Sequence, residues 1–138
     1  MAERSWLLIM DYEDRLLDHI DTLDLEFEVF TDTNDENSSI SVVALPGSRT
    51  INEFYDGIKD KEYIHEIQIK CKVAERDLAT KALTTVAKSL DQEIDIPSKD
   101  GSYDFNDVDV TNEIFFSEAT TDGWMYFKIQ IKSLLTIY

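Results

Sequence analysis

The sequence predicts an α+β domain, in which a mainly antiparallel sheet has two helices packed on one of its faces. Two amphipathic segments with helical spacing and several segments of alternating apolar and polar residues predict these elements. The length of 138 residues fits one domain, and a chain of this size buries roughly two-thirds of its surface on folding. We therefore expect residues 1–138 to form a single domain around one core.

Two segments have the residue spacing of amphipathic helices. In residues 5–23, apolar side chains recur every three or four positions, at Ile9, Tyr12, Leu16, Ile20 and Leu23. In residues 75–92, apolar side chains recur every four positions, at Leu78, Ala82, Val86 and Leu90. Glu75 and Asp77 lie near the start of this second segment and Lys88 lies near its end, as the helix dipole favours.

The first predicted strands begin directly after the first helix. Residues 25–30 and 39–45 alternate apolar and polar side chains, and we expect the two strands to pair antiparallel. The polar segment between them has acids at calcium-loop spacing, but Asn37 and Val43 occupy the positions that require glycine and glutamate. The prediction for residues 31–39 is therefore a solvated hairpin loop.

The remaining strands include two long ones. Residues 46–61 begin with Pro-Gly, and we expect them to form a long excursion between strands. Residues 61–73 and 127–138 each exceed the usual strand length of about five or six residues, so we expect both to be central strands. After the second helix, residues 93–105 are expected to form a loop that ends in an Asp-Gly turn, and residues 103–117 one or two short strands.

The net charge of −16 argues against direct binding to nucleic acid, because such binding depends on cations that replace counterions on phosphate. Residues 1–37 hold twelve acidic and two basic residues, a balance of −10. One interpretation is a solvated acidic face that keeps the protein dispersed. The other interpretation is a surface that repels DNA or binds a basic partner.

The sequence offers little for catalysis. We predict that His19 and His65 lie on polar sides of their elements, and that Cys71 is buried in a strand. Neither histidine belongs to a metal-binding or catalytic motif, and no phosphate-binding glycine loop is present. We therefore expect no enzyme activity, no cofactor and no catalytic residue, although a small carboxylate-dependent enzyme is a third, weaker alternative.

Asp104, Asp107 and Asp109 lie close together in the predicted short strands. The last two share a strand face and have the chemistry to bind a cation. The plainer interpretation is an acidic strand edge that discourages wrong pairing. We therefore expect no metal site here.

Aromatic residues and arginine, the types enriched at protein interfaces, occur in two regions that are not obviously core. The protein-interface candidates are Arg49, Phe54, Tyr55, Tyr103, Phe105 and Trp124. For each of these residues, the alternative interpretation is that its side chain lies in the core. The two regions therefore predict a surface suited to protein contacts.

The order of elements from about Ile40 to Ile137 resembles the minor capsid proteins of tailed phages that infect Gram-positive hosts. The resemblance runs through "SISVVALPGSR", "FYDG", "EYIHEIQIKCK", the Leu/Ala helix, "DGSYDFNDVDVTN" and "GWMYFKIQIKSLLTI". That family is similar in element order to tail terminators, which are small α+β proteins. The resemblance thus implies a tail-terminator-like fold and a non-enzymatic virion protein.

Tail terminators form a six-membered ring that stops growth of the tail tube and presents a surface to the head. The resemblance therefore implies a hexameric ring whose partners are itself, the major tail tube protein and the head-completion or connector protein. It implies a place at the head–tail junction of the virion, and in the host cytoplasm during assembly. No membrane is expected, because no run of about 18 apolar residues occurs.

An alternative of another class is an acidic DNA-mimic inhibitor, which would occupy the basic groove of a DNA-binding protein. Such a protein needs carboxylates spaced like phosphates on an exposed surface. Residues 11–36 contain enough acids to supply them. Neither function involves sequence-specific binding to nucleic acid by this chain.

Overall fold

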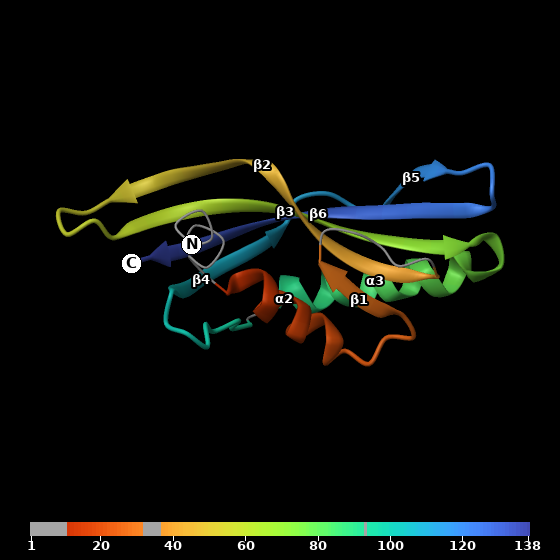
Figure 1. Ribbon diagram of the computed structural model, residues 1–138, viewed down its shortest axis with the longest axis horizontal. Coiled ribbons are helices and arrows are strands. Elements are labelled where there is room, and N and C mark those ends of the chain that lie inside the picture. Colours follow the sequence, from red (N-terminus) through yellow and green to blue (C-terminus); the bar gives the residue numbers. More distant parts are fainter. Residues whose placement is uncertain (1–10, 32–36, 93) are drawn as a thin grey trace, which may run out of the picture.

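A twisted sheet covered on one face by two helices makes up the protein, which was characterised as a computed structural model (Figure 1). The structure describes residues 11–31, 37–92 and 94–138. The helices are α2 (Tyr12–Asp21) and α3 (Arg76–Asp91), and a short 3-10 helix, η2 (Val73–Glu75), precedes α3. The strands are β1 (Glu28–Thr31), β2 (Ser39–Glu53), β3 (Lys59–Lys72), β4 (Tyr103–Val110), β5 (Phe115–Ala119) and β6 (Trp124–Ile137). The predicted α+β class and the placement of both helices on one face are confirmed.

The sheet has the strand order β1-β2-β3-β6-β4, and β5 also pairs with β6. Strands β3 and β6 pair antiparallel without interruption from Lys59↔Ile137 to Lys72↔Trp124. Strand β4 covers one end of the outer side of β6, and β5 covers the other end. The prediction that the two long strands are central is therefore confirmed.

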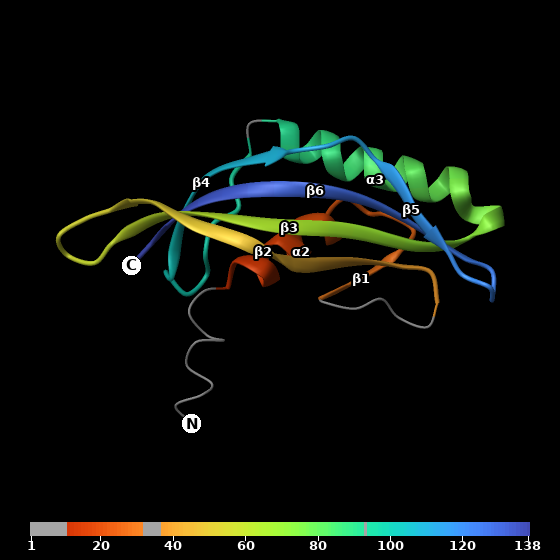
Figure 2. The same ribbon diagram turned by 90° about the horizontal axis from the view of Figure 1, so that it is seen from above.

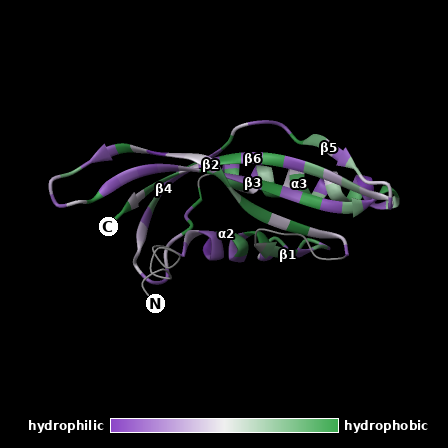
Figure 3. Cartoon of the chain, turned by 45° about the horizontal axis from the view of Figure 1, so that its top comes forward, coloured by the Kyte–Doolittle hydropathy of each residue, from purple (hydrophilic) through white to green (hydrophobic). Residues whose placement is uncertain are grey.

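The core forms between the helices and one face of the sheet. From His65 to Cys71 on β3 and from Phe127 to Ile137 on β6 every second residue is buried, and Figure 3 shows hydrophobic and hydrophilic positions alternating along these strands. Helix α2 contributes Tyr12, Leu16 and Ile20 to this core, as their spacing predicted. Cys71 lies fully buried in it as a free thiol, which confirms its predicted role. Residues 5–10 of the predicted first helix lie outside the described residues.

The pairing of the first two strands differs from the prediction. Strands β1 and β2 are parallel, with Glu28 opposite Ser39 and Thr31 opposite Val42. The alternation in residues 25–30 and 39–45 predicts strands, but it holds no information on their relative direction. The predicted hairpin loop lies mostly outside the described residues.

The predicted excursion over residues 46–61 is wrong, because β2 continues through it to Glu53 and β3 begins at Lys59. The strands shift register between Leu45 and Arg49, so Pro46 and Gly47 form a β-bulge instead of ending the strand. Gly47 has φ +115°, which a glycine adopts without strain. Proline is tolerated at a bulge, where the ladder hydrogen bonds are already interrupted.

One of the two histidines also differs from the prediction. His65 shares the parity of Ile67 and Ile69 on β3, and it is 2% exposed, so its predicted place on the polar face is wrong. His19 is half-buried, and its Nε2 lies 3.1 Å from the Ser89 hydroxyl of α3. It therefore links the two helices.

The second half of the chain follows the prediction closely. The loop over residues 94–102 ends in a turn at Gly101, and two short strands follow it. Asp104, Asp107 and Asp109 are exposed on β4, which is an edge strand. Within the described ranges, no helix combines the length and apolar character needed to cross a membrane.

Candidate protein interface

One end of the sheet extends beyond both helices, and the β2–β3 hairpin at this end is called the arm, defined here as residues 46–62 (Figures 1 and 2). Its residues 59–62 also pair with the end of β6. The arm consists of the second half of β2, the turn over residues 54–58, and the first residues of β3. In the turn, the Phe54 amide donates to the Ile58 carbonyl at 2.9 Å, and the Gly57 amide donates to the Phe54 carbonyl at 3.0 Å. The turn is therefore hydrogen-bonded, and it presents a defined tip.

The tip of the arm exposes large apolar side chains. Ile51 is 41% exposed, Phe54 is 51% exposed and Tyr55 is 112% exposed. Scattered exposed apolar residues are normal, but three within five positions at the end of a projecting hairpin form a concentrated patch. Aromatic side chains in such a patch are suited to fill a pocket on another molecule.

Polar contacts join the two strands of the arm to each other and to β6. Arg49 Nε donates to Glu62 Oε1 across the β2–β3 pair at 2.8 Å, and this bond holds the pKa of Glu62 below its usual range. The Asp60 carboxylate accepts hydrogen bonds from Thr136 on β6 at 2.7 Å and from Asn52 at 3.1 Å, which lower its pKa. The arm is therefore preorganised, which reduces the entropy cost of binding.

Of the predicted interface candidates, Arg49, Phe54 and Tyr55 come together on the arm. Tyr103 does not belong to this surface, because it is 2% exposed in the core of the chain. Its hydroxyl donates to the Ile96 carbonyl at 2.6 Å, and burial raises its pKa above the ordinary range. The prediction of an interface role for Tyr103 is thus corrected to a core role.

The other two candidates lie apart from the arm tip. Phe105 on β4 is half-buried and stacks on Tyr12, with ring centroids 6.4 Å apart. Trp124 begins β6 at the opposite end of the sheet, where Lys70 Nζ lies 4.4 Å from the centre of its ring. Both side chains make contacts within the chain that explain their positions.

A groove lies between α3 and the residues that join β4 to β5. Its volume is about 460 Å³, and it is lined by Thr84, Ala87, Lys88, Asp91, Val110, Thr111, Asn112, Glu113, Ile114 and Ile129. The joining residues are fixed to β6, because the Thr111 amide donates to the Gln130 carbonyl at 2.9 Å and Asn112 Oδ1 accepts from the Gln130 amide at 2.7 Å. The sequence analysis missed this groove, since it depends on how far α3 lies from the linking residues.

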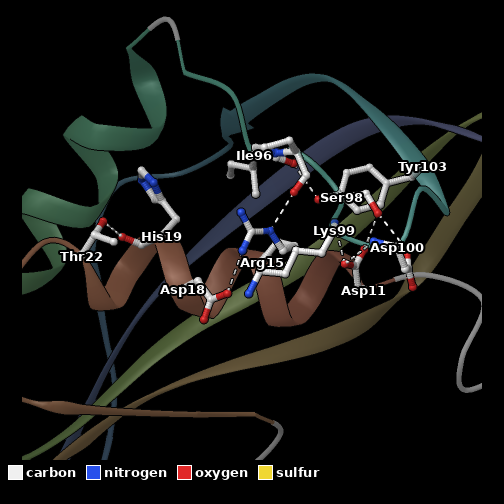
Figure 4. A network of polar contacts seen from close by, with 11 residues as sticks. Asp11, Arg15, Asp18, His19, Thr22, Ile96, Ser98, Lys99, Asp100 and Tyr103 are labelled. Carbon is white, nitrogen blue, oxygen red and sulfur yellow. Dashed lines mark hydrogen bonds and ion pairs between the residues drawn. The ribbon is translucent and has the colours of Figure 1, made fainter.

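A polar network joins α2 to the loop that precedes β4 (Figure 4). Asp11 accepts hydrogen bonds through Oδ1 from Ser98 Oγ at 2.7 Å and through Oδ2 from the Lys99 amide at 2.9 Å. Asp100 accepts bonds from Ser102 and Ser98, which lower its pKa to about 2. These carboxylates bind loop groups of the same chain, so the network acts as a structural clamp.

The clamp extends along α2. Arg15 Nε donates to the Pro97 carbonyl at 2.7 Å, and its Nη1 pairs with Asp18 at 2.9 Å. Thr22 Oγ1 donates to the His19 carbonyl at 2.6 Å near the end of the helix. The bond from Arg15 to Pro97 helps to fix the position of the loop that leads into β4.

Comparisons with known proteins identify a structural neighbour but no family. No protein-family model matches the sequence, and no curated protein matches it. A solved structure whose name describes no function superposes with a TM-score of 0.52 at 14% sequence identity, over 92% of each chain. At this identity the likeness concerns the fold alone.

Proposed function

We propose that this chain is a structural protein of a tailed-phage virion, of the tail-terminator type, which forms a ring on the tail tube and joins it to the head connector. The observation that carries this proposal is the preorganised arm with Phe54 and Tyr55 exposed at its tip. An exposed aromatic tip on a projecting hairpin is suited to contact another protein subunit. The proposal therefore gives the chain a role in assembly.

Two further features support the proposal. The collinear order of elements between about Ile40 and Ile137 resembles phage minor capsid proteins and, through them, tail terminators. The net charge of −16 suits a ring through which DNA passes without binding to the protein. An acidic lumen repels phosphate over roughly a Debye length, about 8 Å at physiological salt.

A binding experiment tests the proposal. The purified chain is incubated with tail tubes assembled from the major tail tube protein of the same phage, and bound protein is measured by sedimentation of the tubes. The expected result is saturable binding at a ratio of a few copies per tube end, independent of tube length. Binding that scales with tube length, or no binding, would contradict a role at the tube end.

A specific observation favours the DNA-mimic inhibitor as the second candidate. Asp14, Asp18 and Asp21 are exposed together on the outer side of α2, in the most acidic part of the chain. This face offers carboxylates to a basic groove. Capture of DNA-binding enzymes that is competed by duplex DNA, together with no binding to tail tubes, would favour this candidate over the first.

A further inference from the structure

We propose that α2 is an acid-released latch on the core: protonation of His65 displaces Tyr12 and undocks α2 from the sheet, while α3 stays in place. The switch starts at His65 on β3, a buried titratable side chain that takes no part in the arm or in the groove beside α3. It concerns a conformational equilibrium within one chain, so it is independent of the proposed function.

The site of His65 suits a neutral imidazole. The side chain is 2% exposed, and its Nδ1 is buried without a hydrogen-bond partner among the described residues. The ring of Tyr12 on α2 lies edge-on to it, with centroids 5.7 Å apart. In the sheet, His65 stands between Ala44 of β2 and Ile131 of β6. An imidazolium has N–H donors at both ring nitrogens, so a charged His65 leaves a donor buried without an acceptor.

The elements around His65 present hydroxyl groups and apolar side chains to it. The hydroxyl-bearing side chains on this face are Tyr12 of α2, Tyr63 of β3, Tyr103 of β4 and Ser133 of β6. The residues that α3 buries in the core are all apolar. Burial is accordingly the cause that lowers the pKa of His65 to about 4.

The charged residues along β3 do not compensate an imidazolium at this place. Lys61 Nζ lies 5.3 Å from the centre of the Tyr63 ring, so the charge that it adds on this face is positive. Glu66 points to the opposite face of the sheet, where it pairs with Lys128 at 3.3 Å. A protonated His65 is therefore destabilised until water reaches it.

Tyr12 is the side chain with which α2 covers His65. It is the first residue of α2 and fully buried, and its hydroxyl lies 2.6 Å from Ser133 Oγ. Displacement of this ring gives water access to the imidazole from the helix side. The two hydroxyls then exchange their mutual hydrogen bond for bonds to water, which has a small net cost. Hydration of the imidazolium therefore favours the state in which Tyr12 has left the core.

The packing of α2 allows it to open separately from α3. Helix α2 has ten residues, and it buries Tyr12, Leu16 and Ile20. A helix of this length is marginal in water without tertiary packing, so it does not persist in place once its first anchor has left. Helix α3 has sixteen residues and packs on β3, β4 and β6. Units of this kind open locally at a lower free energy than the whole domain.

His19 contributes less to the switch than His65. Its Nε2 lies 3.1 Å from Ser89 Oγ of α3, and partial burial lowers its pKa, so its protonation also disfavours the docked helix. Arg15, Asp18 and Asp95 line the same hollow as His19. The two carboxylates compensate part of a positive charge on His19, whereas His65 has no such neighbour among the described residues.

Amide hydrogen exchange of the unmodified chain tests this switch. Protection factors, which correct for the effect of pH on intrinsic exchange, are measured for residues 15–21 of α2 and residues 80–90 of α3. The α2 amides are expected to be at least about tenfold less protected than the α3 amides, because α2 opens locally. Their protection is expected to fall about thirtyfold between about pH 7.5 and about pH 5, because the open state binds a proton at His65 with the ordinary pKa of about 6.5.

Three variants identify the trigger. H65L removes the titrating group and is expected to abolish most of the pH dependence of α2 protection, whereas the control H19Q is expected to keep most of it. Y12F keeps the ring over His65 but removes the hydroxyl that bonds to Ser133. It is expected to lower α2 protection about threefold to tenfold at every pH, with an unchanged pH dependence.

Several outcomes would overturn the latch. Equal protection of α2 and α3 at every pH would mean that α2 opens only together with the whole domain. A protection of α2 that is independent of pH, or that depends on pH equally in H65L, would remove His65 as the trigger. Proton NMR of the unmodified chain gives a check that needs no variant: titration of the His65 ring without a change in the α2 backbone signals would contradict the latch, and a joint change supports it.

Discussion

The ring of Tyr12 on α2 lies edge-on to the ring of His65 on β3, with centroids 5.7 Å apart and an interplanar angle of 64°. The Tyr12 hydroxyl also lies 2.6 Å from Ser133 Oγ on β6, so this tyrosine joins the helix to both central strands. Burial raises the pKa of Tyr12 to about 12. His65 Nδ1 is buried without a hydrogen-bond partner among the described residues. The core therefore contains a neutral imidazole.

This imidazole predicts that the protein loses stability as the pH falls from about 6.5 to about 4. Burial lowers the pKa of His65 from 6.5 to about 4, so the unfolded chain binds more protons than the folded chain between these values. The free energy of unfolding therefore rises with pH in this window, and about 3 kcal/mol is lost when the pH falls through all of it. Urea unfolding of the unmodified chain and of H65L measures the difference, and H65L is expected to show the smaller slope.

H19Q serves as the control for this prediction. Partial burial also lowers the pKa of His19, so H19Q removes part of the slope, but less than H65L does. The carboxylates whose pKa is lowered, such as Glu62 and Asp60, lose their contribution only below about pH 4.5. An unchanged slope in H65L would show that His65 does not titrate as its burial requires.

The burial of His65 could have been predicted from the sequence, whereas other features of the fold could not. Counting by two from Ile67 and Ile69 places His65 on the core face, so its burial was available from the period of the strand. The parallel pairing of β1 with β2 could not be predicted from the sequence. Alternation of apolar and polar residues specifies the two faces of a strand, but it leaves the direction of the strand open. The exposure of Phe54 and the burial of Tyr103 were not available either, because both residues are aromatic and depend on which tertiary partners surround them.

The bulge at Gly47 predicts that the arm depends on this glycine. A Cβ at position 47 would lie 3.1 Å from Ile64 Cδ1, and the backbone has φ +115°. G47A is therefore expected to cost about 1 to 3 kcal/mol and to loosen the arm. Hydrogen exchange of amides in residues 48–62 measures the loosening, and S48A is the neighbouring control. Equal exchange in G47A and the unmodified chain would mean that the bulge does not set the course of β2.

The clamp at Asp11 predicts a local effect on the loop before β4. D11A removes the acceptor of the Lys99 amide and of Ser98 Oγ, so we expect a loss of about 1 to 3 kcal/mol. Faster amide exchange at Lys99 and Asp100 is the measurement. D14A, at an exposed acid on the same helix, is expected to leave both amides unchanged. Similar effects from both variants would indicate helix fraying and no specific clamp.

Self-association is predicted to strengthen with salt. In the proposed ring, six copies with a charge of −16 each would repel one another, and salt screens this repulsion more than it weakens close contacts. Light scattering after chromatography is expected to show larger assemblies at about 0.3 M salt than at about 0.03 M, where the Debye length is longer. Dissociation by added salt would mean that ion pairs dominate the contact between copies.

Electron microscopy of negatively stained tail tubes mixed with the protein tests the central claim most directly. The proposed function predicts a ring-shaped cap at one end of each tube, which is absent when the protein is omitted. Bare tube ends, with all the protein remaining as free monomers at saturating concentration, would contradict it.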